Sequence, residues 1–197
     1  MQRLIKIGIG YIRGLTVAKQ PAIFLDRDGV LNEDKGYAFS ITDLRIPSDV
    51  PGTLAKLKQL GYLLVVVSNQ SGIARGYYQL SDVHAFHDAM QSELKRLSGV
   101  KLDTFYICPH HPEGEIAELR KQCDCRKPGT KMIHDAVKDF NIDLSKSYLI
   151  GDKPSDIECA IRANIPGIQV VSSGHYDKHP GAFAYIQKLS EILDLIK

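Results

Sequence analysis

Apolar residues fall along the chain in two alternating patterns. Short, mainly apolar runs predict strands, and continuous runs of this kind are typical of strands buried on both faces of a sheet: 22–25, 62–67, 103–107, 147–150 and 167–171. Segments between these runs have the composition and length of helices, with apolar residues three or four positions apart: 50–60, 81–97, 131–140 and 155–163. Residues 189–196 predict a last, short amphipathic helix.

This alternation determines the class of fold that we expect. Strands that alternate with helices of this length imply right-handed crossovers and a parallel sheet covered on both sides. Gly61 is expected to end the first helix and Ser81 to cap the second. We therefore predict an α/β protein, a Rossmann-like three-layer sandwich with a mostly parallel sheet, whose ligand binds at the carboxyl ends of the strands.

Polar residues stand at those carboxyl ends. Asp26-Arg27-Asp28-Gly29 follows the first strand and Ser68-Asn69-Gln70 the second. Gly151-Asp152-Lys153 follows the fourth strand, with Asp156 soon after, and Lys127 precedes a helix. Each of these alone is more often a cap or a solvated loop side chain. Converging carboxylates, however, stay ionised together only around a cation, so the combination predicts a magnesium–phosphate site with added lysine charge.

Composition and charge narrow the class of partner. The 197 residues suffice for one domain, or one with a small appendage, and 44% hydrophobic with 24% charged residues is ordinary for a globular protein. The net charge of +2 gives no argument for nucleic acid or a membrane surface. No apolar run approaches the ~20 residues of a membrane helix. We expect a small anionic substrate, held by local cations.

The first twenty residues differ from the rest. They are basic and partly apolar, which is a feature of secretory signals, but Lys6 and Arg13 interrupt the apolar stretch and no small-residue cleavage site follows. A frayed extension, a docked strand or a start codon placed too early are the alternatives. We expect 1–20 to be an N-terminal extension of unknown role and 21–197 to be a single domain.

Four ligand-type residues lie in one loop, 108–125, in the pattern Cys108-x-His110, twelve residues, Cys123-x-Cys125. Three thiolates and an imidazole form a closed tetrahedral shell, which predicts a structural zinc. Buried inert cysteines or a disulfide are the alternatives, and the adjacent His111 could replace His110. The fourth cysteine, Cys159, is expected to be a core thiol. Zinc would order a polar loop that leads directly into Arg126 and Lys127.

Four motifs resemble those of the haloacid dehalogenase superfamily: IFLDRDGV, Ser68 at a strand end, Lys127 before a helix, and Gly151-Asp152 with Asp156. The strings FLDRDGVLN, SNQSGIARG, CPHHPEG, CDCRKP and GDKPSD are similar, over residues 21–196, to the sugar bisphosphate phosphatases of its histidinol-phosphatase-like subfamily. Ser68 stands where threonine is also common. The resemblance favours His110 as the zinc ligand. No large insertion separates Asp26 from Ser68 or Ser68 from Lys127, so we expect no room for the cap domain found in many members of the superfamily.

The resemblance also implies a mechanism. Asp26 would attack phosphorus and form an aspartyl-phosphate, and Asp28 would act as general acid and then base. Magnesium would be held by the Asp26 side chain, the Asp28 main-chain carbonyl and Asp152. Ser68 and Lys127 would hold the phosphoryl oxygens in the transition state.

The implied reaction is hydrolysis of the 7-phosphate of D-glycero-D-manno-heptose 1,7-bisphosphate. It would be a cytoplasmic step toward nucleotide-activated heptose for lipopolysaccharide, carried out by a monomer. Arg126 suits the distant phosphate, since a guanidinium binds phosphate through two donors. The substrate-contacting positions implied are Asp34, Lys35, Gly36, Tyr37, Ser68, Asn69, Gln70, Ser71, Arg126, Lys127 and Lys153. The flap 33–43 and the zinc loop would shape the pocket.

Two alternatives remain open at this stage. Histidinol-phosphate phosphatase shares the nucleophile motif and a zinc loop, but segment 72–76 and the long spacing from His110 to Cys123 favour the heptose substrate. A phosphosugar-binding protein without catalysis is disfavoured by the intact set of Asp26, Lys127 and Asp152. The pattern does not distinguish the α from the β anomer of the 1-phosphate.

Overall fold

A six-stranded parallel sheet forms the centre of the molecule in the computed structural model, which describes residues 5–7, 10–12, 18–171 and 176–196. The strand order is β5-β4-β3-β6-β7-β8. The strands are β3 (Ala22–Leu25), β4 (Leu63–Asn69), β5 (Thr104–Cys108), β6 (Tyr148–Gly151), β7 (Gly167–Val170) and β8 (Ala184–Ile186). All five neighbouring pairs are parallel, which confirms the predicted sheet.

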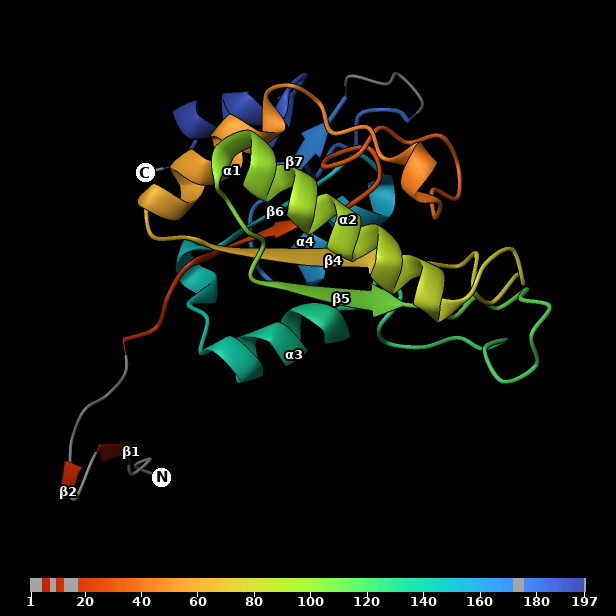
Figure 1. Ribbon diagram of the computed structural model, residues 1–197, viewed down its shortest axis with the longest axis horizontal. Coiled ribbons are helices and arrows are strands. Elements are labelled where there is room, and N and C mark those ends of the chain that lie inside the picture. Colours follow the sequence, from red (N-terminus) through yellow and green to blue (C-terminus); the bar gives the residue numbers. More distant parts are fainter. Residues whose placement is uncertain (1–4, 8–9, 13–17, 172–175, 197) are drawn as a thin grey trace.

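Helices cover both faces of this sheet and give three layers (Figure 1). In β3, Ile23 and Leu25 pack into one core with α1 (Val50–Gln59), α2 (Leu80–Ser98) and the 3₁₀ helix η3 (Leu189–Asp194). Ala22 and Phe24 point the other way, into a second core with α3 (Lys131–Phe140) and α4 (Pro154–Arg162). The period of two along a strand produces this division, and burial on both faces explains the uninterrupted apolar run.

Three details differ from the sequence-based expectations. Ser81 does not cap α2. Gln79 is the N-cap residue instead, and its backbone N–H donates to the Asp82 carboxylate at 2.7 Å. The final segment forms η3, a 3₁₀ helix, although an apolar spacing of three and four residues is compatible with either type of helix. Strand β8 was not predicted, since three residues, of which only Ile186 is buried, carry little periodicity.

The topology brings three strand ends together. The chain enters at β3 in the middle of the sheet, continues outward through β4 to β5, and returns on the other side of β3 as β6. Leu25 is in register with Val66 and with Ile150, so the residues after these positions meet at one edge. The Asp26 amide donates to the Ile150 carbonyl at 2.8 Å. This is the switch point at which open α/β sheets bind ligands.

The longest connections within residues 18–171 are 26–49, between β3 and α1, and 109–130, between β5 and α3. Between β3 and α3 the chain forms η1 (Ile41–Asp43), α1, β4, α2, β5 and the loops that join them, and residues 18–171 hold no inserted cap domain. A further 3₁₀ helix, η2 (Leu144–Lys146), precedes β6. Near the N-terminus, β1 (Ile5–Ile7) and β2 (Gly10–Ile12) pair antiparallel in a separate two-stranded sheet. The remainder of the proposed 1–20 extension, apart from residues 18–20, lies outside the described residues.

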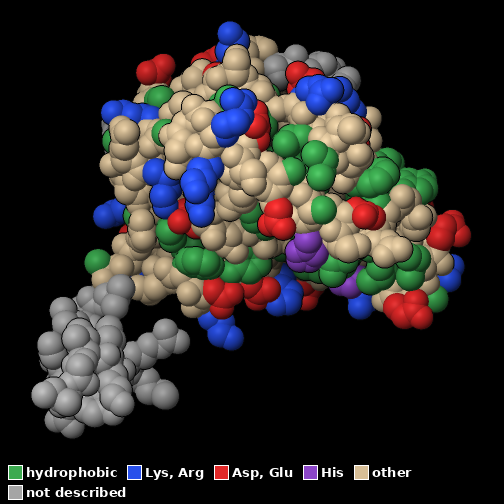
Figure 2. Space-filling view, viewed as in Figure 1, with side chains coloured by type: hydrophobic (Ala, Val, Ile, Leu, Met, Phe, Trp, Pro, Cys, Tyr) green, Lys and Arg blue, Asp and Glu red, His purple; other side chains and the backbone are tan. Residues whose placement is uncertain are grey.

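Acidic and basic side chains are interspersed over the face seen in Figure 2. Among the described residues, none of the helices combines the length and the apolar character that crossing a bilayer requires.

Candidate active site

Asp26 and Lys127 form a buried ion pair at the strand-end edge. The Lys127 ammonium lies 2.9 Å from Asp26 Oδ1 and 2.6 Å from Asp156 Oδ1, and it donates to the Val67 carbonyl at 2.7 Å. Burial opposes the charged form of Asp26, but Lys127 and Lys153 outweigh it and hold the pKa of Asp26 below its usual value. Asp26 is therefore an ionised carboxylate aimed into the site.

A cluster of three carboxylates lies around this pair. Asp26, Asp152 and Asp156 each place an oxygen within 4.8 Å of the others. Both oxygens of Asp152 are buried without a hydrogen-bond partner, and burial, against the pull of Lys153, raises the pKa of Asp152 to about 7. Gly29 (φ +92°) makes room for this side chain, because a Cβ there would lie 2.3 Å from Asp152 Oδ2.

These carboxylates suit a divalent cation. Unpartnered buried carboxylate oxygens are costly, and oxygen ligands from one or two carboxylates, completed by phosphate and water, are what magnesium prefers. Of the predicted magnesium ligands Asp26, Asp28 and Asp152, the structure brings the first and third together. The Asp28 carboxylate does not belong to the cluster, in keeping with its assignment through the main-chain carbonyl. Asp156 joins the cluster instead.

Asp28 faces the same pocket from the other side. Its carboxylate receives Arg27 Nε and Nη2 at 3.0 and 2.7 Å, and Gln70 Nε2 lies 3.4 Å away. Burial raises the pKa of Asp28 in spite of Arg27, which favours the protonated form that a general acid needs. Gln70 also donates to Ser68 Oγ at 2.8 Å and accepts from the Tyr78 hydroxyl at 2.9 Å, so the hydroxyl and the acid share one network.

The pocket at this edge is lined by all four predicted catalytic residues, Asp26, Asp28, Ser68 and Lys127. Its lining residues are Asp26, Asp28, Ser68, Asn69, Lys127, Lys153, Ser155 and Asp156. Ser155 was not predicted, and Asp156 was recognised as part of the fourth motif without being given a role in the site. Their position at the beginning of α4, where an acidic residue caps the helix, conceals their contact with the pocket: the Asp156 carboxylate accepts from the Lys153 amide at 3.0 Å.

The flap residues predicted to contact substrate lie at the rim. Lys153 Nζ is 3.0 Å from Asp34 Oδ2. Tyr37 has a left-handed backbone (φ 52°) and packs edge-on against Tyr77, with ring centroids 4.8 Å apart. Lys35 and Gly36 are exposed. None of the four predicted flap residues lines the pocket, and neither do three other predicted contacts, Gln70, Ser71 and Arg126.

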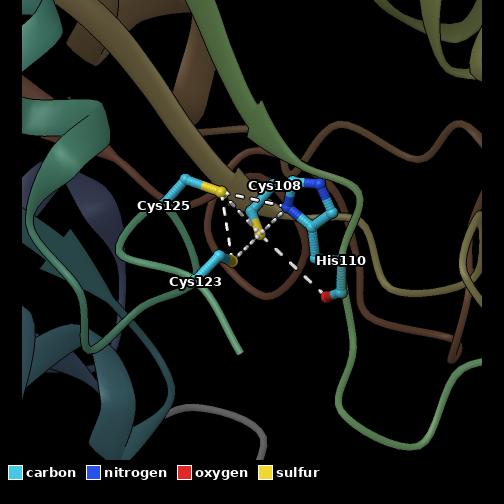
Figure 3. Close-up of side chains that lie close together, drawn as sticks. All are labelled: Cys108, His110, Cys123 and Cys125. Carbon is cyan, nitrogen blue, oxygen red and sulfur yellow. Dashed lines mark hydrogen bonds between the residues drawn. The ribbon is translucent and has the colours of Figure 1, made fainter. Parts of the chain in front are cut away.

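The cysteine loop brings its four predicted ligands together (Figure 3). The Sγ atoms of Cys108, Cys123 and Cys125 are 3.2 to 3.5 Å apart, and His110 Nδ1 is 3.3 Å from Cys125 Sγ. A tetrahedral zinc site with bonds of ~2.3 Å has ligand–ligand distances of ~3.8 Å, so a small adjustment outward accommodates the ion. His111 lies elsewhere, 3.2 Å from Arg75 Nη2.

The loop is connected to the active site through its last residues. The Lys127 amide donates to Asn69 Oδ1 at 2.9 Å, and Asn69 Nδ2 donates back to the Lys127 carbonyl at 3.1 Å. Arg126 is half-buried, and its buried Nη1 has no hydrogen-bond partner among the described residues. Cys159 is buried away from the cluster, as expected, and donates to the Gly129 carbonyl at 3.3 Å.

Comparisons with known proteins identify the family of this chain. Residues 124–192 match the family model described as HAD-hydrolase-like. Over 175 residues the chain is 42% identical to D-glycero-beta-D-manno-heptose-1,7-bisphosphate 7-phosphatase of Haemophilus ducreyi, covering 89% of this chain and 96% of that protein. Over 157 residues it is 43% identical to D-glycero-alpha-D-manno-heptose-1,7-bisphosphate 7-phosphatase of Photorhabdus laumondii, covering 80% and 85% of the two chains.

A solved structure shares the architecture. The D,D-heptose 1,7-bisphosphate phosphatase from B. bronchiseptica, crystallised in complex with magnesium and phosphate, superposes with a TM-score of 0.76 at 27% identity. The match covers 89% of this chain and 97% of that one. An enzyme of this fold thus holds the ion and the anion that the cluster of carboxylates and lysines fits.

Proposed function

This chain belongs to the heptose-1,7-bisphosphate 7-phosphatases of the haloacid dehalogenase superfamily, and from this membership we propose that it hydrolyses the 7-phosphate of D-glycero-D-manno-heptose 1,7-bisphosphate. The observation that carries the proposal is the ionised Asp26, paired with Lys127 beside the unpartnered carboxylate of Asp152. A nucleophile, a cation and a place for a metal therefore meet in one pocket. The product would be heptose 1-phosphate, a precursor of nucleotide-activated heptose.

In the first step, Asp26 attacks phosphorus in line with the departing sugar oxygen. The bond from phosphorus to that oxygen breaks, Asp28 gives its proton to the oxygen, and the phosphoryl group is left on Asp26. In the second step, Asp28 takes a proton from a water molecule, which attacks phosphorus and releases phosphate and Asp26. Ser68 and Lys127 stabilise the charge spread over the phosphoryl oxygens in both steps.

Magnesium, when bound, would shield the repulsion between the anionic nucleophile and the anionic phosphate. We assign its ligands as the Asp26 side chain, the Asp28 main-chain carbonyl and Asp152. Asp156 keeps its ion pair with Lys127 at 2.6 Å and so supports the lysine.

We place the sugar and its second phosphate toward the rim of the pocket. The proposed contacts are Asp34, Lys35, Gly36, Tyr37, Asn69, Gln70, Ser71, Arg126 and Lys153. Arg126 suits the 1-phosphate, because its unpartnered Nη1 supports a charged ligand and a guanidinium binds phosphate through two donors. We also propose that residues 21–197 form one phosphatase domain that acts as a cytoplasmic monomer.

The direct test is turnover of both anomers of heptose 1,7-bisphosphate, with histidinol phosphate for comparison and phosphate release as the readout. We expect at least a ~100-fold preference in kcat/KM for one heptose anomer over histidinol phosphate, since the latter lacks a group for Arg126 to bind. The preferred anomer will assign the 1-phosphate stereochemistry, which differs between the two relatives compared here. Faster turnover of histidinol phosphate would refute the proposed substrate.

We propose that Cys108, His110, Cys123 and Cys125 bind a structural zinc. Cys123→Ser should lower the zinc content and reduce kcat/KM for heptose bisphosphate about tenfold or more, because loops of this kind order only with their metal. Turnover of a small phosphate ester should fall less, since Lys127 is also held by Asn69. Metal analysis by mass spectrometry and steady-state kinetics provide the readouts.

Cys159→Ser is the matched control, because its buried thiol lies outside the cluster. It should retain zinc and the kinetics of the native protein. A native protein that contains no zinc when freshly purified would contradict the metal assignment. Cys123→Ser with native kinetics would contradict the role given to the loop.

A further inference from the structure

Arg27 stands between the two aspartates of the strand-end turn, and its side chain is fully buried. Its Nε donates to Asp28 Oδ1 at 3.0 Å and its Nη2 to Asp28 Oδ2 at 2.7 Å. Nη2 also donates to the carbonyl of Ala38 in the flap at 2.5 Å, and the guanidinium lies 4.6 Å from the centroid of the Phe86 ring in α2. The acid, the flap and a core helix thus hold the guanidinium in one orientation.

This arrangement gives the two oxygens of Asp28 different surroundings. Oδ2 receives Arg27 Nη2 and lies 3.4 Å from Gln70 Nε2, whereas the closest described donor to Oδ1 is Arg27 Nε. Gln70 is itself fixed by its bonds to Ser68 and Tyr78. Oδ1 therefore retains the capacity for a further hydrogen bond. The carboxyl group to which it belongs lines the pocket together with Asp26.

A purely structural role does not account for this placement. An apolar side chain of similar volume would fill the same space and avoid the cost of burying a charge, as replacements of buried ion pairs show. Arg27 instead directs two donors at the carboxyl group that the mechanism uses. A planar fork of donors fixes both the position and the rotation of a carboxylate, which a single donor does not.

We propose that Arg27 is the positioning residue of the general acid: it holds Asp28 so that Oδ1 delivers the proton to the departing oxygen. The inference rests on the proposed phosphatase function. As the bond from phosphorus to the leaving oxygen breaks, the proton passes from Oδ1 to that oxygen, and the alcohol leaves. Asp28 is then a carboxylate held for the return transfer from water. Through Ala38, the same guanidinium ties the flap to the acid.

The test compares two esters that differ in their need for an acid. An alkyl phosphate requires a proton on its leaving oxygen, whereas 4-nitrophenyl phosphate releases a stable anion. For Arg27→Met, kcat/KM should fall about 100-fold with the alkyl ester, a part of the roughly 10²- to 10⁴-fold value of general acid catalysis. It should fall less than about fivefold with the aryl ester. An equal loss with both esters would reduce Arg27 to a structural role and overturn the proposal.

A double-mutant cycle distinguishes a positioning role for Arg27 from a purely structural one. In an Asp28→Asn background, Arg27→Met should cost nothing further with the alkyl ester, because a positioning residue acts through the group that it positions. Independent, multiplicative losses would overturn the proposal.

Arg27→Lys keeps the positive charge but lacks the pair of guanidinium donors. It is the variant to use if Arg27→Met does not fold. It should show the same difference between the esters, smaller in size, with a native circular dichroism spectrum. An equal loss of kcat/KM with both esters, relative to the native protein, would again overturn the proposal. Wild-type turnover of heptose bisphosphate is a separate measurement, so failure of the proposed substrate is distinguishable from failure of this inference.

Discussion

Asp26→Asn should abolish turnover while the protein stays folded. The amide keeps the shape of the carboxylate but has no charge with which to attack phosphorus, and removal of a covalent nucleophile costs roughly 10⁴- to 10⁶-fold in kcat. The fold should survive because Lys127 keeps its partner Asp156 at 2.6 Å and its bond to the Val67 carbonyl. Phosphate release measures the loss, and thermal unfolding monitored by circular dichroism measures the stability.

Asp88→Asn is the matched control, since this aspartate is exposed on α2, far along the chain from the strand ends. It should retain native kinetics. A second check traps the intermediate: native protein stopped during turnover should carry phosphate on Asp26 in a peptide digest, and Asp26→Asn should carry none. Near-native turnover by Asp26→Asn would refute the covalent mechanism.

Removal of magnesium should have an effect of similar size. Treatment with EDTA should lower turnover at least about 10³-fold and added magnesium should restore it, because several kcal/mol of charge stabilisation disappear with the ion. Asp152→Asn should need much more magnesium or stay inactive. Titration of activity against free magnesium provides the measurement.

The structure adds a readout of magnesium binding without turnover. In the metal-free protein Asp152 is buried without a hydrogen-bond partner, so its charge is unfavourable, and the Tm of Asp152→Asn should equal or exceed that of the native metal-free protein. The rise in Tm that magnesium gives the native protein should vanish in the variant. Asp177→Asn, at an exposed aspartate, should preserve that rise. Full activity in metal-free buffer would contradict the assignment.

The sheet and its principal site were predictable because two periodicities carry them. Runs such as 22–25 and 63–67 are apolar throughout since both faces of the sheet are covered, and parallel order follows from the intervening helices. Asp26, Ser68 and Asp152 then had to meet at one edge. Predicting that they meet requires only that the strands run parallel, which follows from the alternation of strands and helices along the chain.

Side-chain partnerships were not predictable in the same way. Nothing local in Asp26-Arg27-Asp28 indicates that Arg27 turns into the core and holds its neighbour, because the decisive contacts are with Ala38 and Phe86. Asp156 has the spacing of a helix cap, and it is one. Its second contact, with Lys127, depends on how the loop that follows the cysteines folds back on the sheet. Such contacts are long-range in sequence.

The internal pairing of Lys127 has a consequence for the order in which this protein would acquire its ions. Lys127 already pairs with Asp26 and Asp156, so the sheet can assemble before any magnesium binds, whereas the Asp152 carboxylate has no hydrogen-bond partner. The loop 108–125 would have no such internal substitute, because its order would depend on the proposed zinc. Zinc would therefore bind once, as the new chain folds, whereas magnesium would bind and dissociate repeatedly in the folded enzyme.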